Sequence, residues 1–221
     1  MKIREVRMKT AKLDDQERFY AGILGLPCKR DQEDRLIISL QDSQLIFEKD
    51  PGGQISNYHF AFNISSNKLM RAFEWIKTRV ELVWIKDQGG YIADFVNWNA
   101  RSIYFLDPAG NIVELIARFD LNDRKEGPFS PADIYSISEA GLVFPKAQYE
   151  EDVQRTMHEA RTEYFTKQPP LPGFCALGDD EGLLICVPEG RTWYSTENVQ
   201  AAISPIALKI EKEGQVYELN W

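Results

Sequence analysis

Histidine is scarce in this sequence, which has only two, His59 and His158, among 221 residues. Cysteine is also scarce: Cys28, Cys175 and Cys186 are an odd number and lack the paired spacing of a zinc site. Each cysteine lies in an apolar segment, where a reduced thiol behaves as a small hydrophobic side chain. We therefore expect buried structural thiols, without disulfides or a cysteine-based metal site.

Long apolar runs are absent as well, since no segment approaches the roughly 20 residues of a membrane-spanning helix. No apolar stretch follows the basic residues near the start of the sequence, as a secretory signal would require. Clustered cations are also missing: 26 Lys and Arg stand against 34 Asp and Glu, for a net charge of −8. Because nucleic-acid affinity depends on clustered cations, we expect no nucleic-acid partner. The sequence predicts a cytoplasmic protein that does not act on membranes.

The hydrophobic pattern repeats along the first half of the chain. One strand, one helix and three strands are predicted in that order, and the order then returns after about 54 residues. The first set covers 3–9, 13–24, 27–29, 36–40 and 44–49, and the second covers 58–64, 67–80, 82–85, 102–106 and 111–117.

A polar segment broken by two prolines, residues 121–131, predicts a linker. Beyond it, a strand at 137–144, a helix at 148–160 and two hairpins within 174–187 and 206–219 predict a third related module. We therefore divide the chain into a first domain of two modules, residues 1–121, and a third module, residues 132–221.

Three polar residues occupy one equivalent position in the three modules. Glu5, His59 and Glu139 each lie on a predicted first strand, at the same sequence distance before an apolar helix residue. If the first two modules close edge to edge into one cup, Glu5 and His59 meet Glu114 from the last strand of the second module. Counting from the turn puts Cys186 at the position of Glu114 in the third module, which predicts no second metal site there.

Several segments resemble the vicinal oxygen chelate superfamily, which includes glyoxalases, bleomycin- and fosfomycin-resistance proteins and extradiol dioxygenases. The resemblance covers residues 1 to about 121. It is carried by Phe19-Tyr20 with Leu24-Gly25-Leu26, by Tyr58-His59-Phe60-Ala61-Phe62, and above all by the segment RSIYFLDPAGNIVEL at 101–115. The resemblance implies an α+β fold in which paired βαβββ modules form a cupped mixed β-sheet, to which the third C-terminal module is added.

The resemblance also implies metal ligands. His59 matches the histidine that opens the second module, Glu114 matches the glutamate of its last strand, and Glu5 falls where metalloenzymes of the family usually have a histidine. The fourth ligand position falls on Ile46, with Glu48 two residues farther along the same face. We therefore predict a divalent metal ion on Glu5, His59 and Glu114, with Glu48 as catalytic base.

One imidazole and two carboxylates favour Mn, Mg, Zn or Ni over Fe, because ring-cleaving iron sites use two histidines and one carboxylate. The leading hypothesis is a metal-dependent lyase, isomerase or thiol-transferase that acts on a small oxygenated metabolite. The alternatives are a metal-free protein that sequesters a drug-like molecule, as bleomycin-resistance proteins do, and a ring-cleavage dioxygenase, which the ligand set disfavours.

Other residues are candidates for binding the substrate. Arg7 shares a strand face with Glu5, and Trp98 and Arg101 precede the strongest motif, where a guanidinium could pair with an anionic group. The sequence leaves open whether residues 190–194, Gly-Arg-Thr-Trp-Tyr, line a pocket or pack a loop. We also expect a homodimer through the third module, whose apolar surface we assign to Phe174, Leu177, Leu184 and Trp193.

Overall fold

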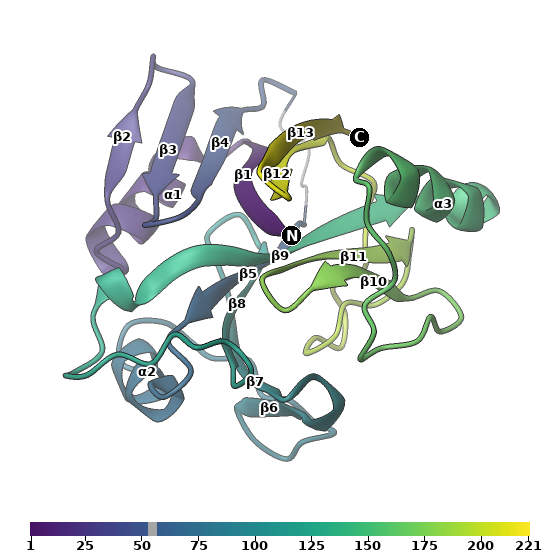
Figure 1. The fold of residues 1–221 in the computed structure, drawn as a ribbon. Coiled ribbons are helices and arrows are strands. Elements are labelled where there is room, and N and C mark those ends of the chain that lie inside the picture. Colours follow the sequence, from purple (N-terminus) through teal and green to yellow (C-terminus); the bar gives the residue numbers. More distant parts are fainter. Residues whose placement is uncertain (53–56) are drawn as a thin grey trace.

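The chain has an α+β fold, seen in a computed structural model that describes residues 1–52 and 57–221 (Figure 1). Thirteen strands within the described residues form one mixed sheet, and the helices pack against it. The predicted fold class of βαβββ modules in a curved mixed sheet is confirmed.

The first module follows the predicted order. Its strand β1 runs parallel to β4, so the helical segment between them crosses over one face of the sheet. Phe19 and Tyr20 in that segment are buried against the strands. The elements are β1 (Lys2–Thr10), α1 (Leu13–Glu17), a π-helical segment (Arg18–Ile23), β2 (Cys28–Arg30), β3 (Arg35–Ser39) and β4 (Gln44–Lys49).

The second module repeats this arrangement, with β5 parallel to β8. Its elements are β5 (His59–Ile64), α2 (Leu69–Ile76), β6 (Ile92–Phe95), a 3₁₀ turn (Val96–Trp98), β7 (Ala100–Leu106) and β8 (Ile112–Arg118). The predicted strand at 82–85 is wrong: this segment makes only isolated bridges, such as Leu82 to Phe105, and the strand that pairs with β7 is β6. The apolar composition of 82–85 favours a strand, but Trp84 is exposed and the segment turns at Gly89 instead of extending along β7.

The hairpin between β7 and β8 is fixed by a buried carboxylate. Asp107 accepts hydrogen bonds from the backbone and side-chain amides of Asn111 and from Gln16. Gly110 has φ +86°, a conformation that glycine adopts without a Cβ penalty. This turn sets the start of β8 and therefore the position of Glu114.

The strands after the linker join both earlier modules. A 3₁₀ turn (Pro131–Asp133) leads into β9 (Ile134–Phe144), and the rest is a 3₁₀ turn (Lys146–Gln148), α3 (Tyr149–Glu159), β10 (Cys175–Asp179), β11 (Gly182–Pro188), β12 (Ile206–Lys212) and β13 (Gln215–Asn220). Strand β9 pairs antiparallel with β5 and parallel with β11, while β12 pairs antiparallel with β1.

The expectation that the first two modules close edge to edge is therefore wrong. Strand β9 crosses the middle of the molecule between β1 and β5 (Figure 1), and its one ladder pair with β1 among the described residues is Ile137 with Ile3. The cup that contains β5 and β8 is completed by β9 and β11, and β1 is completed by the β12–β13 hairpin. Residues 132–221 thus contribute strands to two different cups.

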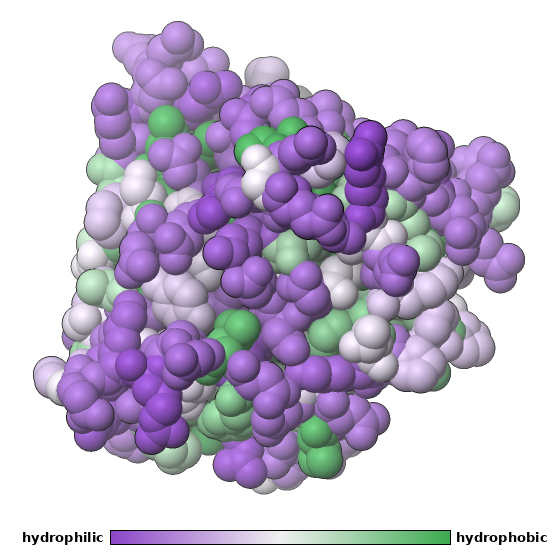
Figure 2. All heavy atoms as spheres, viewed as in Figure 1, coloured by the Kyte–Doolittle hydropathy of each residue, from purple (hydrophilic) through white to green (hydrophobic). Residues whose placement is uncertain are grey.

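The apolar side chains on which we based the predicted homodimer already pack within the chain or line a cavity. Leu177, Leu184 and Trp193 are buried, and Phe174 lines an internal cavity. The face drawn in Figure 2 is mainly hydrophilic, with small separate apolar patches. The homodimer stays a prediction, but these residues no longer support it.

Two further expectations concern the cysteines and membranes. Cys175 and Cys186 are buried free thiols and Cys28 is half-buried, so the described chain holds no disulfide. None of the helices in the described residues is long and apolar enough to cross a membrane.

Candidate metal centre and ligand cavity

Three buried side chains converge at the centre of the second cup. The Nε2 atom of His59 lies 3.6 Å from Oε2 of Glu114 and 3.6 Å from Oε2 of Glu139. One ligand atom from each residue lies within 4.8 Å of the other two. All three residues are less than a tenth exposed.

The register of three neighbouring strands brings these residues together. Ala61 on β5 pairs with Glu114 on β8 and, on its other side, with Glu139 on β9. His59 lies two residues before Ala61 and therefore on the same face of the sheet. The small side chain of Ala61 leaves the space between the two glutamates open to the imidazole.

A glycine makes room on the β9 side of the imidazole. A Cβ at Gly141 would lie 3.2 Å from the Cβ of His59 and 2.8 Å from the Trp193 ring. The Trp193 and His59 rings are 5.3 Å apart between centroids. Gly141 therefore lets the tryptophan cover the histidine.

A buried arginine compensates one of the two glutamates. Arg118 donates through Nη2 to Glu139 and through Nε to Ser138 Oγ at 3.0 Å, and its side chain is fully buried. Its Nη1 atom lies 4.0 Å from Asp180, which is in turn paired with Lys167. Arg118 thus supplies Glu139 with a buried cation and fixes its orientation.

The protonation of the cluster follows from burial and from the close approach of the two acids. Burial and, after it, the negative charge of Glu139 raise the pKa of Glu114 to about 7, while His59 opposes the shift. Burial lowers the pKa of His59, but the hydrogen bond to Glu139 and the charges of both glutamates outweigh it, so the net shift is upward. Without a metal ion the cluster therefore retains protons close to neutral pH.

The donor set fits a divalent cation. Separations of 3.6 Å allow two ligand atoms to approach one ion at the ~2.0 to 2.2 Å typical of imidazole and carboxylate ligands. The Oε1 atom of Glu114 is buried and makes no hydrogen bond of normal geometry among the described residues, although the Ser102 and Tyr104 side chains approach this carboxylate and lower its pKa. Two carboxylates face one permanent cation, Arg118, and this imbalance favours a positive ion or a bound proton.

Glu5, predicted as a metal ligand, is not brought to this cluster. Its carboxylate accepts a hydrogen bond from Arg7 at 2.7 Å and lies 3.3 Å from Lys209 on β12. The pairing of β1 with β12, in place of β5, moves Glu5 into the other cup. Arg7, predicted to bind substrate, is held by Glu5 there.

Glu48, predicted as catalytic base, is also outside the cluster. It accepts hydrogen bonds from Lys9 and Arg35, each at 2.7 Å. Burial works to raise the pKa of Glu48, but these two cations outweigh it and lower that pKa. A carboxylate stabilised in this way is a weak base, and it does not line the cavity described below.

The fourth ligand position is apolar in both cups. In the parallel β1–β4 pair, Ile46 stands where Glu114 stands in the β5–β8 pair, as predicted. In the β9–β11 pair this position is Ile185, because Gly141 pairs with Ile185 as Ala61 pairs with Glu114. The assignment of Cys186 to this position is wrong by one residue, and Cys186 packs on the other face of the sheet.

An aromatic cavity of about 320 Å³ opens beside the cluster. Trp98, which we predicted to bind the substrate, is part of its lining. Arg101 does not line it, and is paired with Asp94 at 2.8 Å on a half-exposed surface. The lining consists of His59, Glu114 and Glu139 together with Phe95, Trp98, Tyr104, Gln168, Leu171, Phe174, Ile185, Arg191, Trp193 and Tyr194.

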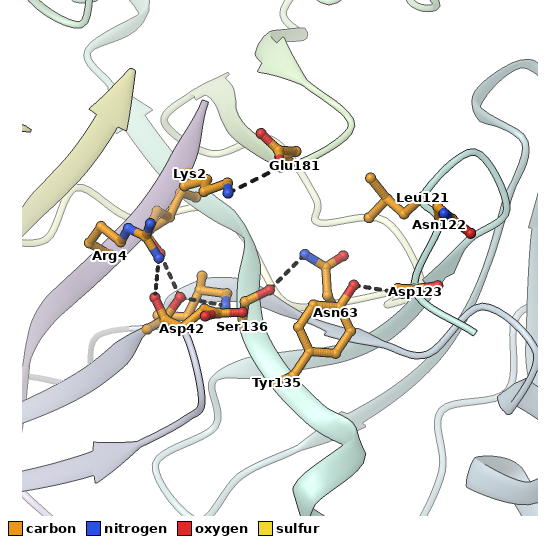
Figure 3. A pocket seen from close by; sticks show the side chains of 13 residues that line it. Lys2, Arg4, Asp42, Asn63, Leu121, Asn122, Asp123, Tyr135, Ser136 and Glu181 are labelled. Carbon is orange, nitrogen blue, oxygen red and sulfur yellow. Dashed lines mark hydrogen bonds and ion pairs between the residues drawn. The ribbon is translucent and has the colours of Figure 1, made fainter. Parts of the chain in front are cut away.

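A second hollow, of about 210 Å³, is polar and lies beside the start of β9 (Figure 3). Most of its polar side chains already have partners within the chain. Lys2 faces Glu181 at 3.4 Å, and the Tyr135 hydroxyl donates to Asp123 at 2.6 Å. Asn63 donates to Ser136, as Figure 3 shows. These pairs account for the polarity of the hollow, and we assign it no chemistry.

Sequence reasoning missed Glu139 as a member of the cluster, although it recognised that Glu139, His59 and Glu5 occupy equivalent positions. It also left Arg191 and Trp193 undecided. The equivalent positions of Glu5, His59 and Glu139 in their modules were the signal that could have found Glu139. The sequence did not show that β9, and not β1, pairs with β5.

A solved structure shares this fold over most of the chain, and others match about half of it more weakly. A Bacillus subtilis protein provisionally described as a dioxygenase matches with a TM-score of 0.58 and 16% identity, over 96% of this chain and 71% of that chain. A glyoxalase/bleomycin resistance protein/dioxygenase from Nocardioides matches at 20% identity over 57% of this chain and 89% of its own, with a TM-score of 0.43. A lactoylglutathione lyase from Agrobacterium tumefaciens matches at 21% identity over 52% and 91%, with a TM-score of 0.40.

The chain therefore has the fold of the vicinal oxygen chelate proteins, over most of its length. No protein-family model matches it, and no curated protein does. The fold class that the motifs suggested is confirmed, and the site must be argued from its own residues.

The arginine gives a first prediction. Substituting Arg118→Met leaves the buried Glu139 carboxylate without its cation, so the free energy of unfolding should fall by roughly 3 to 5 kcal/mol. The double variant Arg118→Met, Glu139→Gln removes both charges and should recover part of this loss. Urea denaturation of the metal-free proteins measures both. Equal stability of the single and double variants would show that Arg118 does not serve Glu139.

A second prediction concerns pH. The folded metal-free protein keeps a proton on Glu114 up to about pH 7, whereas the unfolded chain releases it near the ordinary value of 4.5, and the raised pKa of His59 acts in the same sense. Between these values the folded state binds more protons than the unfolded state, so this contribution to stability is lost as pH rises.

The melting temperature of the metal-free protein should therefore fall between about pH 5 and pH 8 by more than that of the Glu114→Gln variant, which lacks the buried acid. Scanning calorimetry at several pH values measures the difference. Parallel pH profiles for the two proteins would contradict the raised pKa of Glu114.

Proposed function

We propose that this protein is a divalent-metal-dependent enzyme whose ion is held by His59, Glu114 and Glu139 and whose substrate occupies the adjacent aromatic cavity. The observation that carries the proposal is the convergence of three buried ligand atoms within 4.8 Å of one another on the wall of a cavity. Structural ion pairs rarely leave a buried carboxylate oxygen without a hydrogen bond of normal geometry, as Oε1 of Glu114 is in the described structure.

The residues around the ion have distinct tasks. Bound in this cluster, a divalent ion would supply Lewis acidity toward an oxygen of the substrate. Arg118 and Ser138 orient Glu139, and Trp193 covers His59 against water. The aromatic walls exclude solvent, which strengthens electrostatic interactions inside the cavity. This arrangement supports lyase, isomerase or thiol-transferase chemistry on a small oxygenated molecule.

The donor types support Mn, Mg, Zn or Ni as the ion. The cluster offers one imidazole and two carboxylates, whereas ring-cleaving iron enzymes use two histidines and one carboxylate. His158 cannot supply the second imidazole, because it lies exposed on α3, outside the cavity lining. Ring cleavage is therefore disfavoured as the reaction.

A metal-free binding protein is the second candidate. The aromatic cavity favours it, because such walls bind planar apolar molecules without any metal. In that case the proton on Glu114, together with Arg118, would balance the charge of the cluster. Metal content separates the two candidates.

Metal retention is the third prediction. Protein purified without chelators should contain close to one divalent ion per chain by plasma mass spectrometry. The His59→Ala and Glu114→Gln variants should lose it, since each removes a ligand. The matched controls are His158→Ala, which removes the other histidine, and Glu5→Gln, which removes the glutamate that the sequence favoured. Both controls should retain the ion.

Two results would contradict the proposal. A metal-free wild-type protein that takes up no added Mn, Zn, Ni or Mg would support the sequestering protein instead. Loss of the ion in Glu5→Gln with retention in a folded Glu139→Gln variant would restore the ligand set predicted from sequence.

A further inference from the structure

The loop after β11 contributes a cation and a hydrogen-bond donor to the cavity that the metal site does not use. Arg191 and Trp193 are both part of the lining. They belong to the segment 190–194 that the sequence left undecided.

Arg191 has no carboxylate partner. Its guanidinium lies 5.1 Å from the centre of the Phe174 ring, and it makes no ion pair or side-chain hydrogen bond with any residue in the described parts of the chain. Arg191 is about half-buried, and desolvation lowers its pKa. The other arginine near the motifs, Arg101, is already paired with Asp94. An unpaired guanidinium on a cavity wall is suited to the bidentate binding of a carboxylate.

Trp193 adds an unsatisfied donor two residues away. Its indole N–H is buried and finds no acceptor among residues 1–52 and 57–221. Buried tryptophan N–H groups usually have a partner. A ligand with acceptor oxygens would satisfy both Arg191 and Trp193.

Much of the remaining cavity wall is aromatic. Phe95 and Trp98 pack with centroids 5.6 Å apart, and Tyr104 and Tyr194 with centroids 6.0 Å apart. Flat aromatic walls bind planar rings by stacking and by edge contacts. The wall thus favours a ligand with a flat ring, and the unpaired donors favour a ligand with acceptor oxygens.

We propose that the cavity binds a planar aromatic carboxylate, with its ring between the aromatic walls and its carboxylate on Arg191 and Trp193. This inference names a substrate class for the proposed enzyme. It rests on the proposed function only because it treats the bound ligand as a substrate. The binding itself does not need the metal ion.

The test uses 2-naphthoate, its neutral amide 2-naphthamide and the saturated carboxylate octanoate as probes, in isothermal titration calorimetry. Wild-type protein should bind 2-naphthoate roughly 10- to 100-fold more tightly than 2-naphthamide, as expected for a charge-assisted hydrogen bond. It should also prefer 2-naphthoate to octanoate. Both preferences should survive dialysis against a chelator.

Variants of Arg191 and Arg101 distinguish which arginine binds the carboxylate. Arg191→Met should remove the preference for the carboxylate over the amide, and Arg191→Lys should restore part of it because it retains a charge without the planar fork. Arg101→Met is the matched control and should behave as wild type. The comparison of the probes on wild-type protein holds even if an Arg191 variant does not fold.

The inference is overturned if wild-type protein binds 2-naphthoate and 2-naphthamide equally, if the preference disappears on chelation, or if Arg101→Met abolishes it while Arg191→Met does not. Octanoate bound as tightly as 2-naphthoate would overturn the aromatic part. Metal content is measured on the same samples. A protein without metal that prefers the aromatic carboxylate would refute the proposed enzyme and leave this inference standing.

Discussion

The burial of two glutamates beside one histidine is the constraint on which the second cup depends. Removing charged groups from water costs several kcal/mol per ion, so the cluster must be compensated. Arg118 compensates Glu139 directly. Glu114 has no comparable cation, and burial raises its pKa to about 7. Either a proton or a metal ion must therefore complete the cluster, and the pairing of β5, β8 and β9 brings its members together for that purpose.

The two cups show opposite solutions to the same constraint. In the first cup, Glu5 and Glu48 occupy the concave side but are paired with cations from neighbouring strands. The two acids of that cup are therefore each compensated by at least two cations. In the second cup, the walls are largely aromatic, and only Glu139 of the two buried glutamates is paired with an arginine. The same arrangement of strands thus gives an ion-pair network in one cup and a candidate ligand site in the other.

Much of the local structure could be predicted from the sequence, because each βαβββ module is encoded by alternation, helix periodicity and turn residues within a short segment. The motif around Asp107 identified both the hairpin and Glu114. The partner of β5 could not be predicted, since β1 and β9 are both first strands of modules and present Glu5 and Glu139 at equivalent positions. The choice is made by long-range pairing, which short-range patterns do not encode.

The remaining errors have similarly specific causes. Counting from the turn reached Cys186 in place of Ile185, because the β10–β11 turn differs in length from the β7–β8 turn, and one residue changes the face of a strand. Arg101 seemed the better anion ligand because it adjoins the strongest motif, yet Asp94 on β6 occupies it. β6 was itself absent from the prediction. Arg191 lies in an irregular loop, where no periodic pattern indicates which way a side chain points.

The central claim is that Glu139, and not Glu5, shares a metal ion with His59 and Glu114. Anomalous diffraction from crystals soaked in Mn²⁺ tests it directly, because the signal locates the ion independently of the protein density. We predict one strong anomalous peak within about 2.5 Å of ligand atoms from His59, Glu114 and Glu139. A peak beside Glu5 and Glu48, or no peak in the second cup, would contradict the account.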